Sequence, residues 1–228
     1  MFSFTIGNTR SPEVIYMDGN VDNGKIEAKK TGTTTVGLVC KDGVVLASDR
    51  RATMGYFIAS KDIDKIYPIA DTIAMTIAGS VGDAQTLVRW MKAELKIYEL
   101  RHGTKASVEA AATLLANILS QNKFFPFFVQ LLVGGIDKKP RLFSVDMLGG
   151  VTEEKLSSTG SGSPIAYGVL EDRYAEDKLV DDNVKVAAKA VATAIKRDAG
   201  SGENVDVVIL TKGGFKRLPR ETVKKMAK

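Results

Sequence analysis

The order of β-rich and helical blocks constrains the fold of this 228-residue chain more than any other feature of the sequence. Short β-rich runs come first: "TTVGLVC" and "VVLAS" around a "KDG" turn, then "KIYPI" and "TIAMTI". Two helical segments follow, then the strands "FFVQLLVGGI" and "RLFSVD", a second helical pair over residues 164–198, and "NVDVVILT" as the closing strand. Because hairpin-linked strands alternate with paired helices, we expect antiparallel sheets covered by helices, not an alternating parallel sheet.

The first helical pair carries two apolar stripes. In "SVGDAQTLVRWMKAELKIYELRHG", Ser80 is an expected N-cap, Asp83 places a carboxylate in the first turn, and Gly103 ends the helix. The residues at helical spacing on its apolar face are Ala84, Leu87, Val88, Met91, Leu95 and Tyr98. "ASVEAAATLLANILSQN" repeats the pattern with Val108, Ala111, Ala112, Leu115 and Leu119. We interpret both stripes as core.

Composition favours one globular domain without a membrane span. The chain is 44% hydrophobic, but it contains no apolar run of the length that a bilayer requires. Residues 1–30, with "MDGNVDNG" in the middle, predict a loosely structured leader, and they lack the basic start and apolar core of a secretory signal. The lone cysteine, Cys40, cannot form an internal disulfide, so we expect a reducing, cytoplasmic setting.

The net charge of +5 is concentrated at one end of the chain. Residues 212–228 contain seven basic residues and one acid, Glu221, so this segment carries +6 and the remainder carries −1. A basic C-terminal segment is more often a solvated end or a contact with a neighbouring subunit than a nucleic-acid stripe. We therefore do not expect nucleic acid as a partner.

Histidine is too scarce for two common kinds of hydrolytic site. The only histidine, His102, stands at an expected helix end, where a cation suits the helix dipole. One histidine and one cysteine leave no zinc site with the usual ligands and no convincing Ser-His-Asp triad, and nothing else indicates a metal or cofactor. If the chain is a hydrolase, its nucleophile must be activated in another way.

The stretch "KKTGTTTVGLVC" offers such a nucleophile. A threonine at a chain's N-terminus has a free α-amine beside its hydroxyl, and the pKa of that amine, roughly 7.7–8.0, lets it accept the hydroxyl's proton near neutral pH. Gly32 has no Cβ to hinder attack on its carbonyl, so the hydroxyl of Thr33 could cut the Gly32–Thr33 bond and release its own amine. A threonine run is also simply a good strand former, and the tripeptide alone does not decide between the two.

Further motifs give the sequence a close resemblance to a known family. "TGTTTVGLV", "ASDRRATMG", "AGSVGDAQ", "LLVGGID", "STGSGSPIAYGVLE" and "RDAGSG" together resemble the proteasome β subunit of archaeal type, an N-terminal-nucleophile hydrolase. The resemblance runs from Thr33 to about Thr211. It implies an α+β fold, a four-layer αββα sandwich of two antiparallel sheets flanked by helix pairs. It also implies a leader, residues 1–32, that is removed from a domain over residues 33–228.

By resemblance, the catalytic group centres on Thr33 as nucleophile, with Gly32 before the cleaved bond. Asp49 and Lys65 match the acid and the lysine beside the nucleophile, although many relatives carry glutamate at the position of Asp49, so its reach is one methylene shorter. The ammonium would favour the neutral amine and the developing alkoxide. Gly79 matches the residue whose backbone N–H faces the oxyanion. The sequence leaves open whether the Thr33 amine or Lys65 takes the proton.

The same resemblance assigns supporting and substrate-binding roles. Ser161, Asp198 and Ser201 match the residues that orient the amine and hydroxyl of the threonine. Thr53 matches a strand position that binds the substrate backbone. The residue before the cut would meet apolar walls that Met54 and neighbouring subunits could modify. The expected substrate-binding residues are Ala52, Thr53, Ile77, Gly79 and Val81. Without the resemblance, each of these would be interpreted as an ordinary loop, turn or surface residue.

The resemblance implies a threonine endopeptidase that degrades unfolded proteins in the cytoplasm without metal or cofactor. Its partners would be other β subunits in a ring of seven, α subunits in rings that cap a four-ring barrel, and a separate ATP-dependent unfoldase. The chain itself has no phosphate-binding Gly-Lys-Ser/Thr loop. Alternatives are a catalytically silent β subunit, a related bacterial peptidase with six-membered rings and, less consistent with the motifs, a monomeric binding module.

Overall fold

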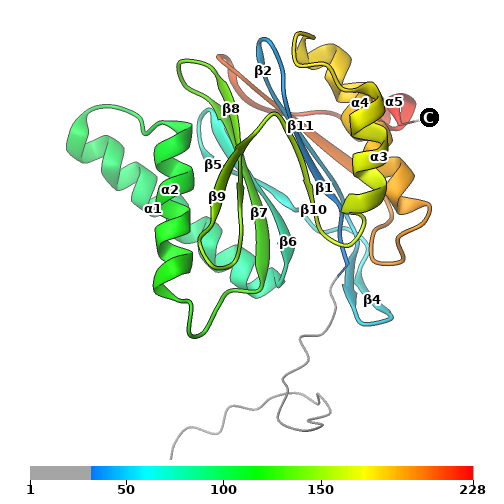
Figure 1. Ribbon diagram of the computed structural model, residues 1–228, viewed down its shortest axis with the longest axis horizontal. Helices are drawn as coiled ribbons and strands as arrows, with labels where there is room; N and C mark the ends of the chain where they lie inside the picture. The colour runs from blue at the N-terminus through cyan, green and yellow to red at the C-terminus, as the bar shows by residue number, and fades with distance from the viewer. Residues whose placement is uncertain (1–31, 228) are drawn as a thin grey trace, which may run out of the picture.

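The computed structural model describes residues 32–227, in which two five-stranded antiparallel sheets lie between layers of helices (Figure 1). The predicted α+β fold, a four-layer αββα sandwich, is confirmed. The predicted leader, residues 1–30, lies outside the described residues. No helix among residues 32–227 is both long enough and apolar enough to cross a membrane.

The first sheet has the strand order β10–β1–β2–β11–β12. In that order the strands span Leu156–Thr159, Thr35–Val39, Gly43–Asp49, Val205–Thr211 and Gly214–Arg217. The threonine-rich stretch thus enters the sheet as β1, between β10 and β2, and every residue of β1 and β2 is buried. Because both faces of these strands are covered, they show continuous apolar runs in the sequence.

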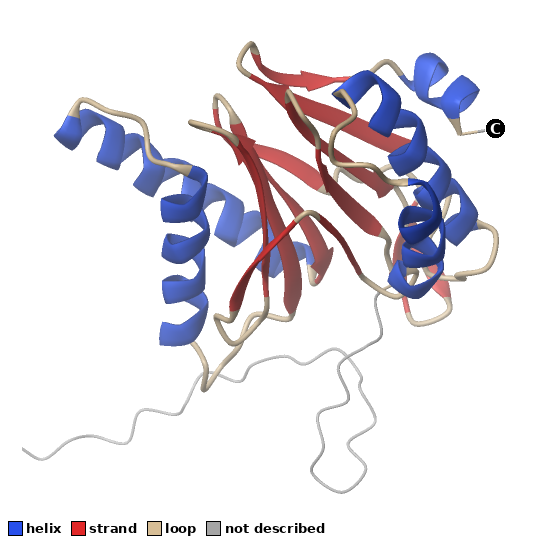
Figure 2. Cartoon of the chain, turned by 45° about the horizontal axis from the view of Figure 1, so that its top comes forward, coloured by secondary structure: helices blue, strands red, loops and turns tan. Residues whose placement is uncertain are grey.

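The second sheet has the order β5–β6–β7–β8–β9, and a separate hairpin pairs β3 with β4. The five strands span Ile66–Ala70, Ile73–Gly79, Val129–Ile136, Pro140–Val145 and Val151–Glu154. The hairpin strands are Ala52–Met54 and Phe57–Ser60. Figure 2 shows the strands of the two sheets facing each other in the centre, with helices outside.

The helices cover the two sheets unequally. They are α1 Val81–His102, α2 Val108–Gln121, α3 Ser163–Arg173, α4 Val180–Ile195 and α5 Arg220–Met226. The α1/α2 pair packs on the second sheet, and α3, α4 and α5 pack on the first. Between the sheets lies a third cluster that includes Leu46, Leu132 and Leu142. Each sheet face therefore contributes to a buried layer.

The predicted helix signals of the first pair are confirmed with one exception. Ser80 caps α1 by accepting from the Asp83 N–H, and Gly103 ends the helix in the left-handed conformation with φ 66°. Tyr98 was predicted on the core face, and this is wrong: its ring is 40% exposed and contacts the ring of His102, with centroids 4.4 Å apart. An i, i+4 aromatic contact at the helix end takes the place of burial.

The C-terminal segment also differs from the prediction. β11 does not close the domain, because β12 pairs antiparallel with it and α5 follows. Val223 of α5 is 1% exposed and belongs to the apolar cluster beneath α3 and α4. The basic segment is therefore part of the fold rather than a solvated end.

Candidate active site

Thr33 lies two residues before the start of β1 and is still joined to Gly32. Thr33 is 3% exposed, and its carbonyl accepts a hydrogen bond from the Gly162 N–H at 3.1 Å. The Gly32 N–H donates to the Thr53 hydroxyl at 2.9 Å. The N-terminus of α3 therefore holds Thr33, and the hairpin strand β3 holds the residue before it.

Asp49 and Lys65 meet the hydroxyl of Thr33. The Thr33 hydroxyl donates to Asp49 Oδ1 at 3.0 Å, the Lys65 ammonium donates to the same carboxylate oxygen at 2.7 Å, and it also contacts Thr33 Oγ1. Asp49 ends β2, which pairs with β1, and Lys65 immediately precedes β5 of the other sheet. The shorter reach of aspartate is sufficient here, because the ion pair forms.

The ion pair is almost closed to solvent: Asp49 is 0% and Lys65 8% exposed. Burial lowers the pKa of the Lys65 ammonium below the ordinary lysine value of 10.5, while the adjacent Asp49 carboxylate acts in the opposite direction. A lysine with a lowered pKa exchanges its proton more readily near neutral pH. The pair can therefore polarise the Thr33 hydroxyl and also move a proton to or from it.

A second polar chain holds the Thr33 nitrogen. The Thr33 N–H donates to Ser161 Oγ at 3.1 Å, and the Ser161 hydroxyl donates to Asp198 Oδ2 at 2.7 Å. The Ser201 hydroxyl donates to the same Asp198 oxygen at 2.6 Å and lies 2.6 Å from the hydroxyl of Thr34. The structure thus brings together the three residues that the sequence predicted to orient the threonine.

Gly79 ends β6 on the other side of Thr33. Its φ is +126°, and a Cβ at this position would lie 2.0 Å from the carbonyl oxygen of Phe128. No side chain fits there without a backbone shift, so the close packing of β6 against Phe128 requires glycine. Gly79 borders both hollows that meet at Thr33. Its proposed role toward an oxyanion remains a prediction.

A cleft of about 420 Å³, partly open to solvent, lies beside Thr33 and contains the predicted substrate-binding residues. Its lining includes Ala52, Thr53, Ile77, Gly79 and Val81. Met54 is not part of that lining, and it is 49% exposed on the hairpin. The sequence analysis missed Ile63, Tyr67 and Ala84, which also line the cleft. The helical and strand patterns assigned Ala84 and Tyr67 to elements but could not show that their faces reach the site.

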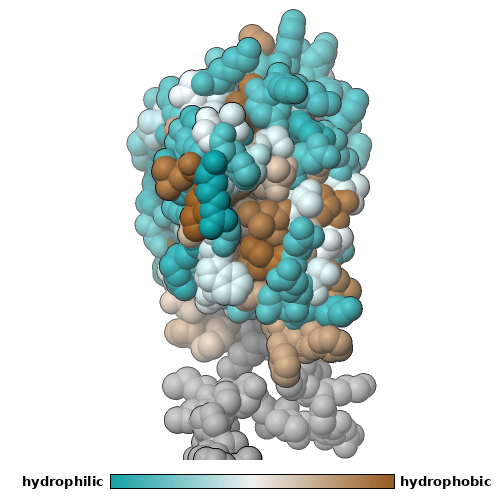
Figure 3. All heavy atoms as spheres, turned by 90° about the vertical axis from the view of Figure 1, so that its left-hand side faces the viewer, coloured by the Kyte–Doolittle hydropathy of each residue, from teal (hydrophilic) through white to brown (hydrophobic). Residues whose placement is uncertain are grey.

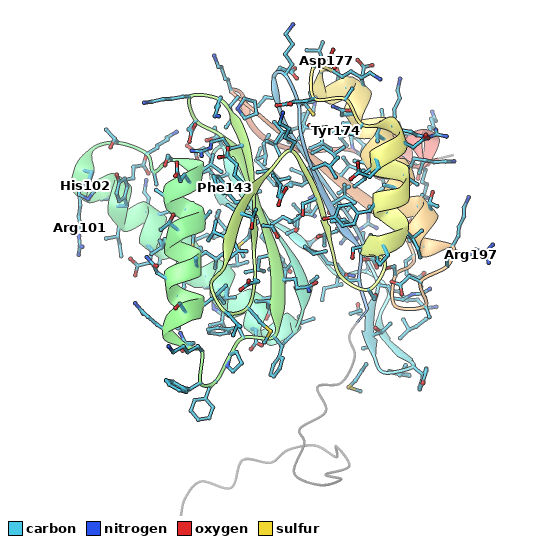
Figure 4. All side chains as sticks on the ribbon, in the orientation of Figure 1. Arg101, His102, Phe143, Tyr174, Asp177 and Arg197 are labelled. Atoms are coloured by element: carbon cyan, nitrogen blue, oxygen red, sulfur yellow. The ribbon has the colours of Figure 1, made fainter. Side chains whose placement is uncertain are left out.

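Two further contacts of Asp49 were also missed. The backbone N–H groups of Arg51 and Gly202 both donate to Asp49 Oδ2 at 3.0 Å. Nothing in the sequence marks a backbone donor, so only the pairing of β2 with β11, which places Val205 opposite Asp49, could have indicated Gly202. His102 takes no part: Figure 4 shows it at the far end of α1, on the side of the molecule away from α3 and α4.

The fold is an N-terminal-nucleophile type of sandwich, with its polar centre where β1, β2 and β5 meet. A family model described as "Proteasome subunit" matches residues 29–210, and the chain belongs to this family. It is similar to "Proteasome subunit beta" of Archaeoglobus profundus, 57% identical over 206 residues that cover 89% of this chain and 96% of the relative.

Two further relatives carry the same name. That of Methanoregula boonei is 56% identical over 197 residues, covering 86% of this chain and 92% of the relative. That of Methanosarcina barkeri is 55% identical over 195 residues, covering 85% and 92%. The chain is thus a β subunit of the 20S proteasome core, a peptidase, and it assembles with other proteasome subunits.

Proposed function

We propose that this β subunit is a catalytic threonine endopeptidase whose nucleophile is Thr33. The observation that carries the proposal is the contact of the Thr33 hydroxyl with both Lys65 and Asp49 while Gly32 is still attached. An internal threonine has no built-in base, so a buried lysine–carboxylate pair at its hydroxyl has a chemical use. Ser161 and Asp198 would orient the nitrogen in both the uncut and the cut chain.

Self-cleavage is the first reaction of this site. The Thr33 hydroxyl attacks the Gly32 carbonyl carbon and gives its proton to the Asp49–Lys65 pair, because the Thr33 nitrogen is still an amide without a basic lone pair. The C–N bond then breaks, the nitrogen takes up a proton, and Gly32 is left as an ester on Thr33. Water hydrolyses that ester, which releases residues 1–32 and leaves Thr33 with a free amine.

Peptide hydrolysis repeats the attack, the ester intermediate and its hydrolysis with a substrate in the cleft, and the freed Thr33 amine is then available beside Lys65 to take the hydroxyl's proton and pass it to the leaving amine. Ala52, Ile77 and Val81 give the wall an apolar lining, which favours cleavage after hydrophobic residues. Gly32 occupies the place before the cut and binds Thr53, so a substrate backbone would use the same acceptor. The Gly79 N–H would stabilise the oxyanion, and the enzyme would need no metal or cofactor.

Assembly completes the proposed function. We place the chain in a ring of seven β subunits, within a barrel capped by α rings, where a separate ATP-dependent unfoldase supplies unfolded proteins in the cytoplasm. Figure 3 shows hydrophobic residues exposed on the face that carries α1 and α2. The exposed apolar side chains of α1 include Trp90, Ile97 and Leu100. Exposed apolar surface of this kind suits contacts between subunits.

The test uses the full chain assembled with its partner subunits. Wild-type chain should lose residues 1–32, as its mass would show, whereas Thr33→Ala should stay uncut and hydrolyse no peptide. Thr35→Ala is the matched control, because the Thr35 hydroxyl bonds the hydroxyls of Thr159 at 2.7 Å and Thr76 at 3.1 Å rather than Asp49 or Lys65. It should still mature. Loss of the leader from pure Thr33→Ala protein would overturn self-cleavage, and an uncut wild-type chain would identify a silent subunit.

A further inference from the structure

The basic C-terminal segment carries two arginines that reach the loop immediately before Lys65. Arg217 of β12 pairs with Asp64 at 2.5 Å, and Arg220 of α5 pairs with Asp62 at 2.8 Å. The segment thus contacts the chain that leads into the active site. These two of the segment's basic residues therefore have specific partners inside this subunit.

Arg217 contacts the chain on both sides of Lys65. Its Nη1 donates to the carboxylate of Asp64, the residue before the lysine, and its Nη2 donates to the carbonyl of Ile66, the residue after it, at 2.7 Å. The hydroxyl of Tyr67 donates to the Asp64 carbonyl at 2.6 Å and so also holds the residue before Lys65. One guanidinium therefore spans the backbone segment that carries Lys65.

Arg50 contacts the same loop and shares an Asp64 carboxylate oxygen with Arg217. It is 6% exposed, and it pairs with Asp62, with Asp64 at 2.7 Å and with the buried Asp206 at 3.3 Å. Its carbonyl also accepts from the Ile63 N–H at 3.0 Å. Arg50 follows Asp49 in the chain, so this anchor links the strand that carries the catalytic carboxylate with the loop that carries the catalytic lysine.

We infer that Arg217 is a positioning residue for Lys65: it holds the Asp64 carboxylate before the lysine and the Ile66 carbonyl after it, and thereby places the ammonium against Thr33 and Asp49. The inference rests on the proposed catalytic role of Lys65. A lysine side chain has four rotatable bonds, so a shift in its backbone changes where the ammonium can reach. Displacement of a catalytic group by about 1 Å can reduce turnover about 100-fold.

The geometry favours positioning over stabilisation as the function of Arg217. The side chains of Arg217 and Asp64 are 33% and 44% exposed, and partly exposed ion pairs contribute little to folding. Arg217 also approaches the buried Asp206 at 3.4 Å, but Arg50 pairs with the same Asp206 oxygen at 3.3 Å and would still neutralise it in an Arg217 variant. The fork of the guanidinium, on the other hand, reaches a carboxylate and a carbonyl in fixed relative positions. A lysine at this position would keep the positive charge but offers a single ammonium, which cannot hold both acceptors in the same way.

The experiment compares Arg217→Lys and Arg217→Ala with wild type, each as full chain assembled with its partner subunits. We expect Arg217→Lys to assemble and to unfold at the wild-type temperature, with kcat for an apolar peptide at least about tenfold lower, KM within about twofold, and slower loss of the leader. Lys216→Ala removes one positive charge from the neighbouring exposed position of β12 and should match wild type. Turnover is expressed per assembled particle, because a loss of stability alone lowers the apparent kcat only through the amount of assembled enzyme.

Two results would overturn the inference. In one, both Arg217 variants turn over within about twofold of wild type although Lys65→Ala is inactive; the proposed function would then stand without the positioning role. In the other, the activity of the Arg217 variants falls only in proportion to the amount of assembled particle, which would make the contact structural. Full turnover by Lys65→Ala would instead refute the proposed function itself.

Discussion

Asparagine in place of Asp49 tests how strongly the buried carboxylate holds the site together. Asp49 is fully buried, and its oxygens accept hydrogen bonds from the Thr33 hydroxyl, the Thr34 N–H, the Lys65 ammonium and the N–H groups of Arg51 and Gly202. Asparagine keeps the size of the side chain but replaces one oxygen with an NH₂ group. Whichever way the amide turns, donors that now have an acceptor would face another donor.

The expected loss of stability in Asp49→Asn follows from breaking the buried ion pair between Asp49 and Lys65. Removing one partner of such a pair destabilises a protein by about 3–5 kcal/mol, and each stranded buried donor costs about 1–3 kcal/mol. Lys65 can limit the damage by releasing its proton. We therefore expect Asp49→Asn to lower the free energy of unfolding by about 3–5 kcal/mol at neutral pH, rather than by the sum of all the lost contacts.

The same change has a defined pH dependence. Burial lowers the pKa of Lys65 in the folded chain below its ordinary value of 10.5. Between these two pKa values the unfolded chain binds more protons than the folded chain does. The free energy of unfolding therefore rises with pH in this range. Asp49 opposes this lowering, so its loss should move the pKa further down and start the rise at lower pH. The difference in stability between Asp49→Asn and its parent should thus shrink as pH increases.

Urea unfolding of the full chain, followed by circular dichroism, measures the stability difference between Asp49→Asn and its parent. A Thr33→Ala background prevents interference from self-cleavage. Asp177→Asn, on the exposed loop between α3 and α4 (Figure 4), removes a carboxylate far from the site and should leave the unfolding midpoint unchanged. A loss below about 1 kcal/mol at neutral pH, the size typical of an exposed pair, would refute the reasoning. So would a difference that grows with pH.

Two further changes test the proposed chemistry in the assembled particle. Lys65→Arg should reduce kcat for an apolar peptide by roughly 100-fold or more, because guanidinium is larger and does not release its proton; near wild-type turnover would make Lys65 a purely structural cation. Val81→Glu adds a carboxylate to the apolar cleft wall, so cleavage should shift from apolar toward basic residues. The product masses from a mixed peptide set would show this shift. An unchanged preference would exclude this cleft as the specificity pocket.

Sequence reasoning succeeded where the physical cause is local. The N-cap at Ser80 and the end of the helix at Gly103 depend on side chains within one turn, and both are present. The five predicted apolar positions of α2 are all 0% exposed because one helical period decides which face is buried. Tyr98 failed because an aromatic ring at a helix end has a second option, contact with His102, that apolar spacing does not reveal.

The site was predicted by resemblance and not by pattern, because its contacts join residues far apart in the chain. Thr33 and Ser161 are separated by 128 positions, and their contact follows from the pairing of β1 with β10, which brings Thr159 beside Thr35. No local period indicates that pairing. The resemblance supplied the positions, and the strand register supplies the reason that those positions meet.

The basic C-terminal segment shows the same limit for charge. Counting charges gave an excess of +6 over residues 212–228 and suggested an outward-facing end. A charge count does not show which charges lie close together in the fold. Asp64 lies 153 positions before Arg217, yet the β11–β12 hairpin places the arginine beside the loop that precedes β5. Arg217 and Arg220 join Arg50 in ion pairs with Asp62, Asp64 and Asp206, so part of the charge that looks surplus in one segment is matched within the fold. Because these charges flank Lys65, the proposed catalytic lysine, their arrangement is expected to influence turnover.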